Sequence, residues 1–152
     1  MATRTSRKFP LARLVALGAC ESQCELFKKK FGKSVDVTPA LCARVARDFD
    51  FYWLETHSPW PSGETAYRET TDLFEKIRKK YEAAKRPHLD KYLAARNRYC
   101  NRYPTRDWCN SPSYPRVYGE LYATTNLIED KYAKDLARAW GKMYVKHGFA
   151  KQ

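Results

Sequence analysis

The sequence lacks several features that would assign it to a common functional class. It has no run of roughly 18 apolar residues, which excludes a membrane-spanning helix by this criterion. It has no glycine-rich phosphate loop, no HExxH and no GxSxG motif. Its three histidines, His57, His88 and His147, are scattered, and none stands beside a cysteine or serine in a nucleophile arrangement. We therefore expect a protein that is not an enzyme and needs no cofactor.

Cysteine is present in an odd number, five, with no spacing typical of a disulfide framework or a zinc site. Cys20 and Cys24 could share one helix face, but no histidine or second cysteine pair follows at ligand spacing. We expect free thiols in a reducing cytoplasm and no bound metal. The helical spacing predicts that Cys20, Cys24 and Cys42 lie on buried faces as small apolar residues. Asp48 and Asp50 would diverge on a helix, so we interpret both as solvated acids.

Acidic residues are in the minority. The chain has 29 lysines and arginines against 17 acids, a formal charge of +12. The excess is largest in residues 1–33, with 8 basic and 2 acidic residues, and in residues 64–103, with 11 and 6. Aromatic residues make up 14% of the chain, and 11 of its residues are tyrosine. Such a protein attracts nucleic acid, nucleoprotein complexes and acidic protein surfaces.

Strand signals are few, and apolar periodicity predicts helices throughout the N-terminal third. A first helix covers residues 11–17 and ends at Gly18, and a second covers residues 19–31 and ends at Gly32. The sequence "SVDVTPAL" is interpreted as the opening of a third helix, with Thr38 as N-cap and Pro39 at its first position. Its apolar face is expected to continue to about Glu55.

The sequence pattern of the remaining chain, from residue 57 onward, predicts two long helices. The segment 57–63 holds two prolines and a glycine and marks a boundary. Tyr67, Phe74 and Tyr81 then recur every seven residues, which predicts a helix packed along a partner. Pro87 either kinks this helix or starts another, and the pattern leaves both open. After a loop at 104–116, a helix of about thirty residues ends near Gly148.

These patterns predict an all-α fold with a small N-terminal helical unit and a long-helix antiparallel hairpin, or coiled coil. The expected domains are 1–57, a proline-rich linker at 58–63, and the hairpin at 64–152. The hairpin is expected to turn its rings inward and its cations outward. The predicted binding residues for nucleic acid or a partner protein are Lys28, Lys29, Lys30, Lys33, Arg78, Lys79, Lys80, Arg98, Tyr99, Arg102 and Tyr103.

Basic residues interleaved with tyrosine suit phosphate neutralisation with base stacking. The same pattern also fits an ordinary solvated helix face, on which Glu75 and Lys79, or Glu82 and Arg86, form spaced pairs. The four tryptophans are expected to anchor core or loops rather than to stack on bases.

The segment "LGACESQCELFKKKFGKSVDVTPALCARVARDFDFYWL", residues 17–54, resembles small proteins of tailed phages and prophages. The shared order is GAC, Q, LF, FG-SV-VT, LC, A, FD and W. The later segment "YEAAKRPHLDKYLAARNRY" is similar to the tyrosine-rich helical repeats that follow it in those proteins. The resemblance covers roughly residues 11–100 and departs after Arg102. It implies a phage accessory protein in the bacterial host cytoplasm, and it implies no catalytic residue.

Two functions are therefore expected from different classes. The first is a non-enzymatic protein whose basic helical surface binds nucleic acid or a host nucleoprotein, as an inhibitor of host defence of the anti-CRISPR kind would. An acidic host protein is an alternative partner for the same surface. The second is a phage structural or assembly protein that forms homo-oligomers through its tyrosine-rich helices.

Overall fold

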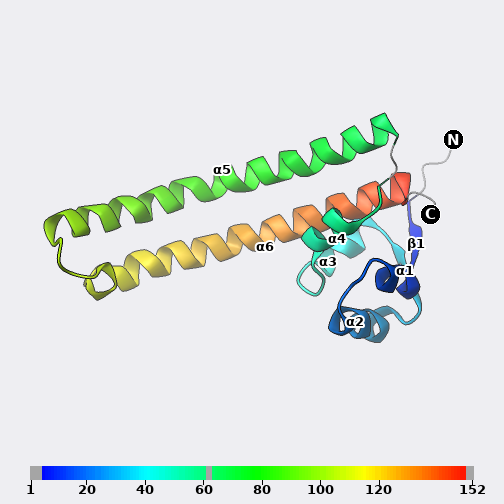
Figure 1. The fold of residues 1–152 in the computed structure, drawn as a ribbon, viewed down its shortest axis with the longest axis horizontal. Coiled ribbons are helices and arrows are strands. Elements are labelled where there is room, and N and C mark those ends of the chain that lie inside the picture. Colours follow the sequence, from blue (N-terminus) through cyan, green and yellow to red (C-terminus); the bar gives the residue numbers. More distant parts are fainter. Residues whose placement is uncertain (1–4, 61–62, 150–152) are drawn as a thin grey trace. The chain divides into compact units, whose positions relative to one another are not determined.

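The structure, a computed structural model, describes residues 5–60 and 63–149 (Figure 1). It is 74% helix and 6% strand, which confirms the mostly helical class. In chain order the elements are β1 (Arg7–Pro10), α1 (Leu11–Ala16), α2 (Glu21–Phe31), β2 (Ser34–Val37), α3 (Pro39–Arg44), α4 (Phe51–His57), α5 (Glu64–Arg102), the 3-10 helix η1 (Trp108–Asn110) and α6 (Tyr114–His147).

The chain divides into two compact units. The first unit contains Met1–Ile77 and Ala133–Gln152, and the second contains Arg78–Tyr132. Helices α5 and α6 each contribute residues to both units. These boundaries differ from the domain division expected at 58–63, a segment in which residues 61–62 lie outside the described part of the chain.

Two short strands stand where only helices and turns were expected. β1 and β2 pair antiparallel, with Arg7 opposite Val37 and Pro10 opposite Ser34. The sequence "SVDV" was interpreted as the approach to a helix, but it alternates β-branched and polar residues, which suits a paired strand. Its partner lies 27 residues away, so only the tertiary fold could supply it. Thr38 still caps α3 as predicted, because its hydroxyl accepts a hydrogen bond from Leu41 N at 3.1 Å.

The single helix expected from Pro39 to about Glu55 is wrong, because two short helices replace it. Helix α3 ends at Arg44, and α4 begins after Asp50. Asp50 is the N-cap of α4, since its Oδ1 accepts a hydrogen bond from Trp53 N at 2.8 Å. Asp48 pairs with Lys30 at 3.1 Å. Both acids therefore have structural partners, whereas solvation alone was expected.

The core of the first unit is aromatic and centres on Phe9, a buried residue of β1. Its ring lies 5.4 Å from Tyr144, 5.7 Å from Trp140 and 6.0 Å from Phe27, measured between centroids. Burying a ring of this size stabilises the fold by about 1.5–3 kcal/mol. Trp140 is 2% exposed, as expected for a core anchor. Its Nε1 donates to Ser58 Oγ at 3.1 Å, so the buried indole N–H is satisfied.

The predicted heptad seam of α5 is partly confirmed. Phe74 and Thr70 are buried, at 1% and 3% exposure. Tyr67, expected in the same seam, is 61% exposed. The buried part of the seam therefore begins at Thr70, and Tyr67, its first aromatic residue, is exposed to solvent.

Cysteine burial also departs from the expectation. Cys42 is buried, but Cys24 is half-buried and Cys20 is exposed at the N-cap of α2. The helix begins one residue after Cys20, so this thiol does not join the apolar face. All five cysteines are free.

In the second unit, α5 and α6 contact each other in an antiparallel sense. Tyr81 stacks on Tyr132 with ring centroids 4.4 Å apart, and Tyr92 meets Tyr118 edge-on at 6.3 Å. Residues later in α5 therefore contact residues earlier in α6, which is what antiparallel helices require. Pro87 lies inside α5, so it does not break the helix. It still removes one backbone donor, which weakens the helix locally.

Candidate nucleic-acid interface

The turn between α5 and α6 carries an unusual charge pattern. Residues 96–116 contain five basic residues, all arginines, and one acid, Asp107. Asp107 caps η1, since its Oδ1 accepts a hydrogen bond from Cys109 N at 3.1 Å. We call this region the arginine-rich end and define its cations as Arg96, Arg98, Arg102, Arg106 and Arg116. All five are exposed.

A buried tryptophan holds this end together. Trp108 is 6% exposed, and its Nε1 donates to the hydroxyl of Tyr92 at 3.2 Å. Its ring lies 5.5 Å from Tyr99 and 5.9 Å from Tyr114. Because α5, η1 and α6 all contribute rings, the arginines are displayed on an ordered support rather than on a loose loop.

Tyr103 receives two guanidinium groups. The Cζ atoms of Arg102 and Arg106 lie 5.6 Å and 5.3 Å from its ring centroid. Cation–π contacts of this kind are worth about 0.5–1 kcal/mol at exposed sites. Tyr99 packs beside Tyr103 at 5.1 Å. Arg102 and Tyr103, both predicted binding residues, are thus in contact, and whether they bind a partner stays a prediction.

The predicted basic residues of α5 do not all share one face. At about 100° per residue, the predicted residues Lys80, Arg98 and Arg102 fall within an arc of about 40° around the helix, which also contains Lys91. Arg78 and Lys79 lie about 100° or more outside that arc. The expected row of cations is thus partly brought together and partly dispersed.

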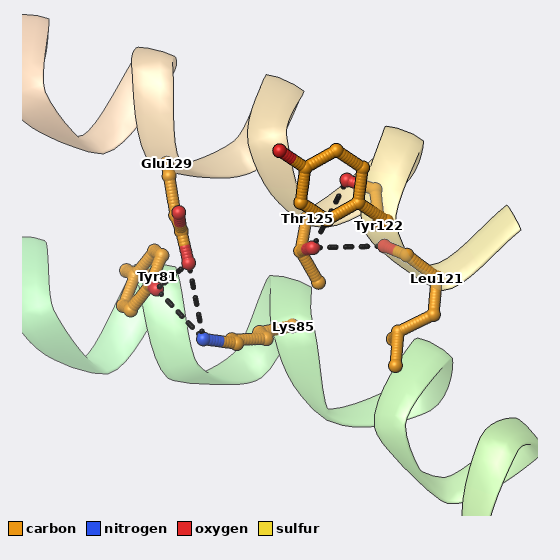
Figure 2. Close-up of polar contacts among 6 residues, drawn as sticks. All are labelled: Tyr81, Lys85, Leu121, Tyr122, Thr125 and Glu129. Carbon is orange, nitrogen blue, oxygen red and sulfur yellow. Dashed lines mark hydrogen bonds and ion pairs between the residues drawn. The ribbon is translucent and has the colours of Figure 1, made fainter. Parts of the chain in front are cut away.

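Several cations along the arm already have acidic neighbours. Lys85 Nζ lies 3.2 Å from Glu129 Oε1 and also donates to the Tyr81 hydroxyl at 3.1 Å (Figure 2). Both hydrogen bonds raise the pKa of Lys85, and the bond to Tyr81 is the larger of the two causes. Lys91 Nζ lies 2.8 Å from Glu120 Oε2 and lowers the pKa of that carboxyl. Arg86 pairs with Asp90 at 3.4 Å.

The arginine-rich end differs from this arm. Within residues 5–60 and 63–149, no carboxylate forms an ion pair with Arg98 or Arg102 in the structure. Lys80 is exposed on the same arc and has no such pair within those residues either. Arg78 and Lys79, by contrast, have interaction partners in the fold. Arg98, Arg102 and Lys80 therefore carry positive charge in the second unit without an acidic partner among the described residues.

The lysines predicted near the start of the chain belong to the first unit. Lys28, Lys29 and Lys30 form the last turn of α2, where positive charge complements the helix dipole. Lys30 is the member that pairs with Asp48. Lys33 is exposed after Gly32, and its carbonyl accepts a hydrogen bond from Leu11 N at 2.9 Å. Lys28, Lys29 and Lys30 therefore have structural roles at the end of α2, whereas the contact of Lys33 is made by its backbone.

Sequence reasoning missed Arg96, Arg106 and Arg116 as site residues. The segment 104–116 was interpreted only as a loop because it is rich in proline, asparagine and serine. The available signal was charge: residues 96–116 have a single acid among five arginines. The burial of Trp108, which packs against rings of α5 and α6, depends on rings from three elements and has no local signature.

Comparisons with protein-family models, curated proteins and solved structures find no match to this chain. Among the described residues, no group of three or more His, Cys, Asp or Glu side chains is arranged to hold a metal ion. No helix in this same part of the chain is long and apolar enough to cross a membrane.

Proposed function

We propose that this chain is a non-enzymatic nucleic-acid-binding protein whose arginine-rich end contacts phosphate groups. The observation that carries the proposal is the presence of five exposed arginines in residues 96–116, a segment that contains buried Trp108 and a single acid, which is engaged in capping. Arginine suits this role because its planar guanidinium binds phosphate oxygens in pairs and remains charged.

The charge of the second unit supports the same proposal. Residues 78–132 contain 12 basic and 6 acidic residues, a formal charge of +6. Neutralising phosphates releases counterions, so affinity should fall steeply with salt. The three pairs formed by Lys85, Arg86 and Lys91 take half of the six acids. The unpaired arginines at the end are then the main groups left to meet phosphate.

The proposal includes a continuous antiparallel hairpin of α5 and α6. Contacts within each unit support it: Tyr81 meets Tyr132 in the second, and Lys146 Nζ lies 2.7 Å from Glu69 Oε2 in the first. The residue numbers in these two pairs have nearly the same sum, as expected for two antiparallel helices that keep one register along their length.

The resemblance to small phage and prophage proteins suggests the setting. In the bacterial host cytoplasm, a basic helical end could occupy the guide or target strand of a defence nucleoprotein, as an inhibitor of the anti-CRISPR kind would. The arginines would then bind nucleic acid that is already part of a complex.

Binding to fluorescently labelled DNA and RNA of about 20 nucleotides, measured by anisotropy between about 50 and 200 mM salt, tests the proposal. The double variant Arg98→Glu/Arg102→Glu should weaken binding by more than tenfold and reduce the salt slope by about two. The control Arg138→Glu/Lys142→Glu makes the same charge change on exposed residues of α6 in the first unit. Equal losses in both variants, or no salt-dependent binding by the wild type, would overturn it.

A structural or assembly role is the second candidate, because the second unit exposes apolar side chains. Leu127 is 74% exposed and Tyr122 59%. Assembly through these residues predicts an oligomer in sedimentation that persists at high salt and that Leu127→Lys dissociates. The positive charge of the unit opposes contact between two copies, which favours the nucleic-acid proposal.

A further inference from the structure

Helix α6 carries a row of three tyrosines with nearly parallel rings. Tyr114, Tyr118 and Tyr122 are spaced four residues apart, with centroids separated by 5.2 Å and 6.4 Å and planes inclined by 19° and 18°. We call these residues the tyrosine row. Tyr118 is 43% exposed and Tyr122 59% exposed. Large rings usually bury most of their surface, so this exposure calls for a reason outside the core.

Only part of the tyrosine row joins the two helices, since Tyr114 packs on Trp108 and Tyr118 on Tyr92, whereas Tyr122 has no ring contact with α5 among the described residues. Tyr132, on the same helix, does join them, because its ring stacks on Tyr81 of α5 at 4.4 Å. Figure 2 shows two neighbouring side chains of α6, one turn before Thr125, that point in different directions. Leu121 points toward α5, and the Tyr122 ring lies alongside α6. Tyr118 meets α5 only through the edge of Tyr92 at 6.3 Å among the described rings. Tyr118 stacks between Tyr114 and Tyr122, whereas Tyr122 ends the row, so its face away from Tyr118 is covered by no other ring among the described residues.

Positive charge lies on the same side of the helix pair. Around α6, Glu129 lies within about 20° of Tyr118 and Tyr122, at about 100° per residue. Glu129 bonds to Lys85, which identifies the side of α5 that adjoins the tyrosine row. Arg96 lies within about 20° of Lys85 around α5, and Tyr103 follows directly after Arg102, the last residue of α5. Arg96 is exposed, and Tyr103 carries the guanidinium groups of Arg102 and Arg106.

We propose that this surface binds single-stranded nucleic acid, with a base stacked on the outer face of Tyr122, at the end of the tyrosine row, and phosphates held by Arg96, Arg102 and Arg106. This inference rests on the proposed nucleic-acid function and names the strand form that the site selects. Base–aromatic stacking requires an unpaired base with a free face, and duplex bases already stack on one another. A duplex can meet the arginines only, whereas a single strand can meet arginines and rings together.

The strand preference is tested with three labelled ligands of equal phosphate number: a single strand of thymidines, a duplex, and an abasic strand that keeps the phosphates. At matched salt, the wild type should bind the thymidine strand about tenfold or more tightly than the other two. Equal affinity for the thymidine and abasic strands would overturn the inference, because charge alone would then explain binding.

Variants of the row separate stacking from charge. Tyr118→Leu/Tyr122→Leu should reduce single-strand affinity at least tenfold and leave duplex affinity unchanged, whereas Tyr118→Phe/Tyr122→Phe keeps the ring faces and the affinity. The control Tyr52→Leu/Tyr67→Leu removes two tyrosines that are 55% and 61% exposed in the first unit, and should change nothing.

The two proposals fail differently in these assays. If the leucine double variant binds single strands as the wild type does, the stacking inference is wrong. If no ligand binds in a salt-dependent way, the proposed nucleic-acid function fails with it. If duplex and single strand bind equally and charge reversal at Arg98 and Arg102 weakens both, the proposed function stands and the strand preference does not.

Discussion

Gly141 of α6 lies against Cys42 of α3, so closely that a Cβ on Gly141 would stand 2.8 Å from Cys42 Sγ. The Cα of Pro39 would be 3.1 Å away. Cys42 is 3% exposed, and the second neighbour, the Cα of Pro39, is a backbone atom. This contact is where the start of α3 packs on the buried face of α6.

Gly141→Ala should therefore destabilise the protein, although alanine favours a helix. Overpacking costs about 1–3 kcal/mol, which exceeds the roughly 1 kcal/mol that alanine contributes to helix propensity. Gly119→Ala is the matched control, because Gly119 lies in the same helix with nothing within 4 Å of its Cβ position. Gly119→Ala should stabilise the protein by about 0.5–1 kcal/mol. Urea unfolding measures both, and a stabilising Gly141→Ala would contradict the packing argument.

The ion cluster at Glu69 predicts a pH dependence. Lys146 donates to both carboxylate oxygens at 2.7 Å, and His147 Nε2 lies 3.2 Å from Oε2. The hydrogen bond from Lys146, with a smaller contribution from His147, lowers the pKa of Glu69. A carboxyl with a lowered folded-state pKa contributes stability above its unfolded pKa of about 4.3, and loses it as pH falls through the folded value.

Glu69→Gln should therefore lower stability at pH 7 by up to about 1 kcal/mol, as for other partly exposed ion pairs. As the pH falls below about 4.3, the variant should lose less stability than the wild type loses. Glu82→Gln, at an exposed position of the same helix, serves as the control. Thermal unfolding across pH 3–7 measures the difference. Parallel curves for the wild type and Glu69→Gln would contradict the assignment.

Trp108 should control both the stability of the second unit and its binding. Trp108→Ala removes a buried ring from the arginine-rich end and should cost about 3–5 kcal/mol. Trp108→Phe keeps the ring packing but loses the N–H donated to Tyr92, so it should lower the free energy of unfolding by about 0.5–1.5 kcal/mol. Hydrogen exchange of residues 96–116 and nucleic-acid affinity should both respond more strongly to the alanine variant. An alanine variant with unchanged exchange would show that the ring is not the support.

The cysteines should differ in reactivity. The hydrogen bond with the Ser22 hydroxyl, at 3.3 Å, is the main cause that lowers the pKa of the exposed Cys20 thiol. Burial raises the pKa of Cys42 to about 12. Since the thiolate is the nucleophile, a short iodoacetamide pulse near pH 8 should label Cys20 and leave Cys42 unmodified.

Peptide mass spectrometry distinguishes the two sites. Ser22→Ala should slow labelling of Cys20, and denaturation should expose Cys42 to the reagent. Labelling of Cys42 at the rate of Cys20 in the folded protein would mean that α3 opens readily.

Local sequence signals predicted most helix ends because those ends depend on a few neighbouring residues. Gly18, Gly32 and Gly148 all adopt a positive φ just after a helix, as their positions predicted. Asp50 was a missed signal of the same kind. It precedes an apolar run and caps α4, but the apolar periodicity across residues 45–53 suggested an unbroken helix.

The candidate site was only partly predictable. Arg98, Tyr99, Arg102 and Tyr103 were identified from their interleaving, and they do cluster at the end of the second unit. Lys85 and Lys91 could not be recognised as neutralised from α5 alone, because their acids lie on α6 more than 25 residues later. Ion pairs across helices depend on register, which no local pattern specifies.

The sequence alone determined a basic, tyrosine-rich and mainly helical chain, together with the glycines and caps that end its helices, because these properties depend on composition and on contacts within a few residues. Only the tertiary structure decided the β1–β2 pairing, the burial of Trp108, and which cations remain without an acidic partner. Those outcomes depend on which distant segments pack together, and side-chain burial and charge neutralisation follow from that packing.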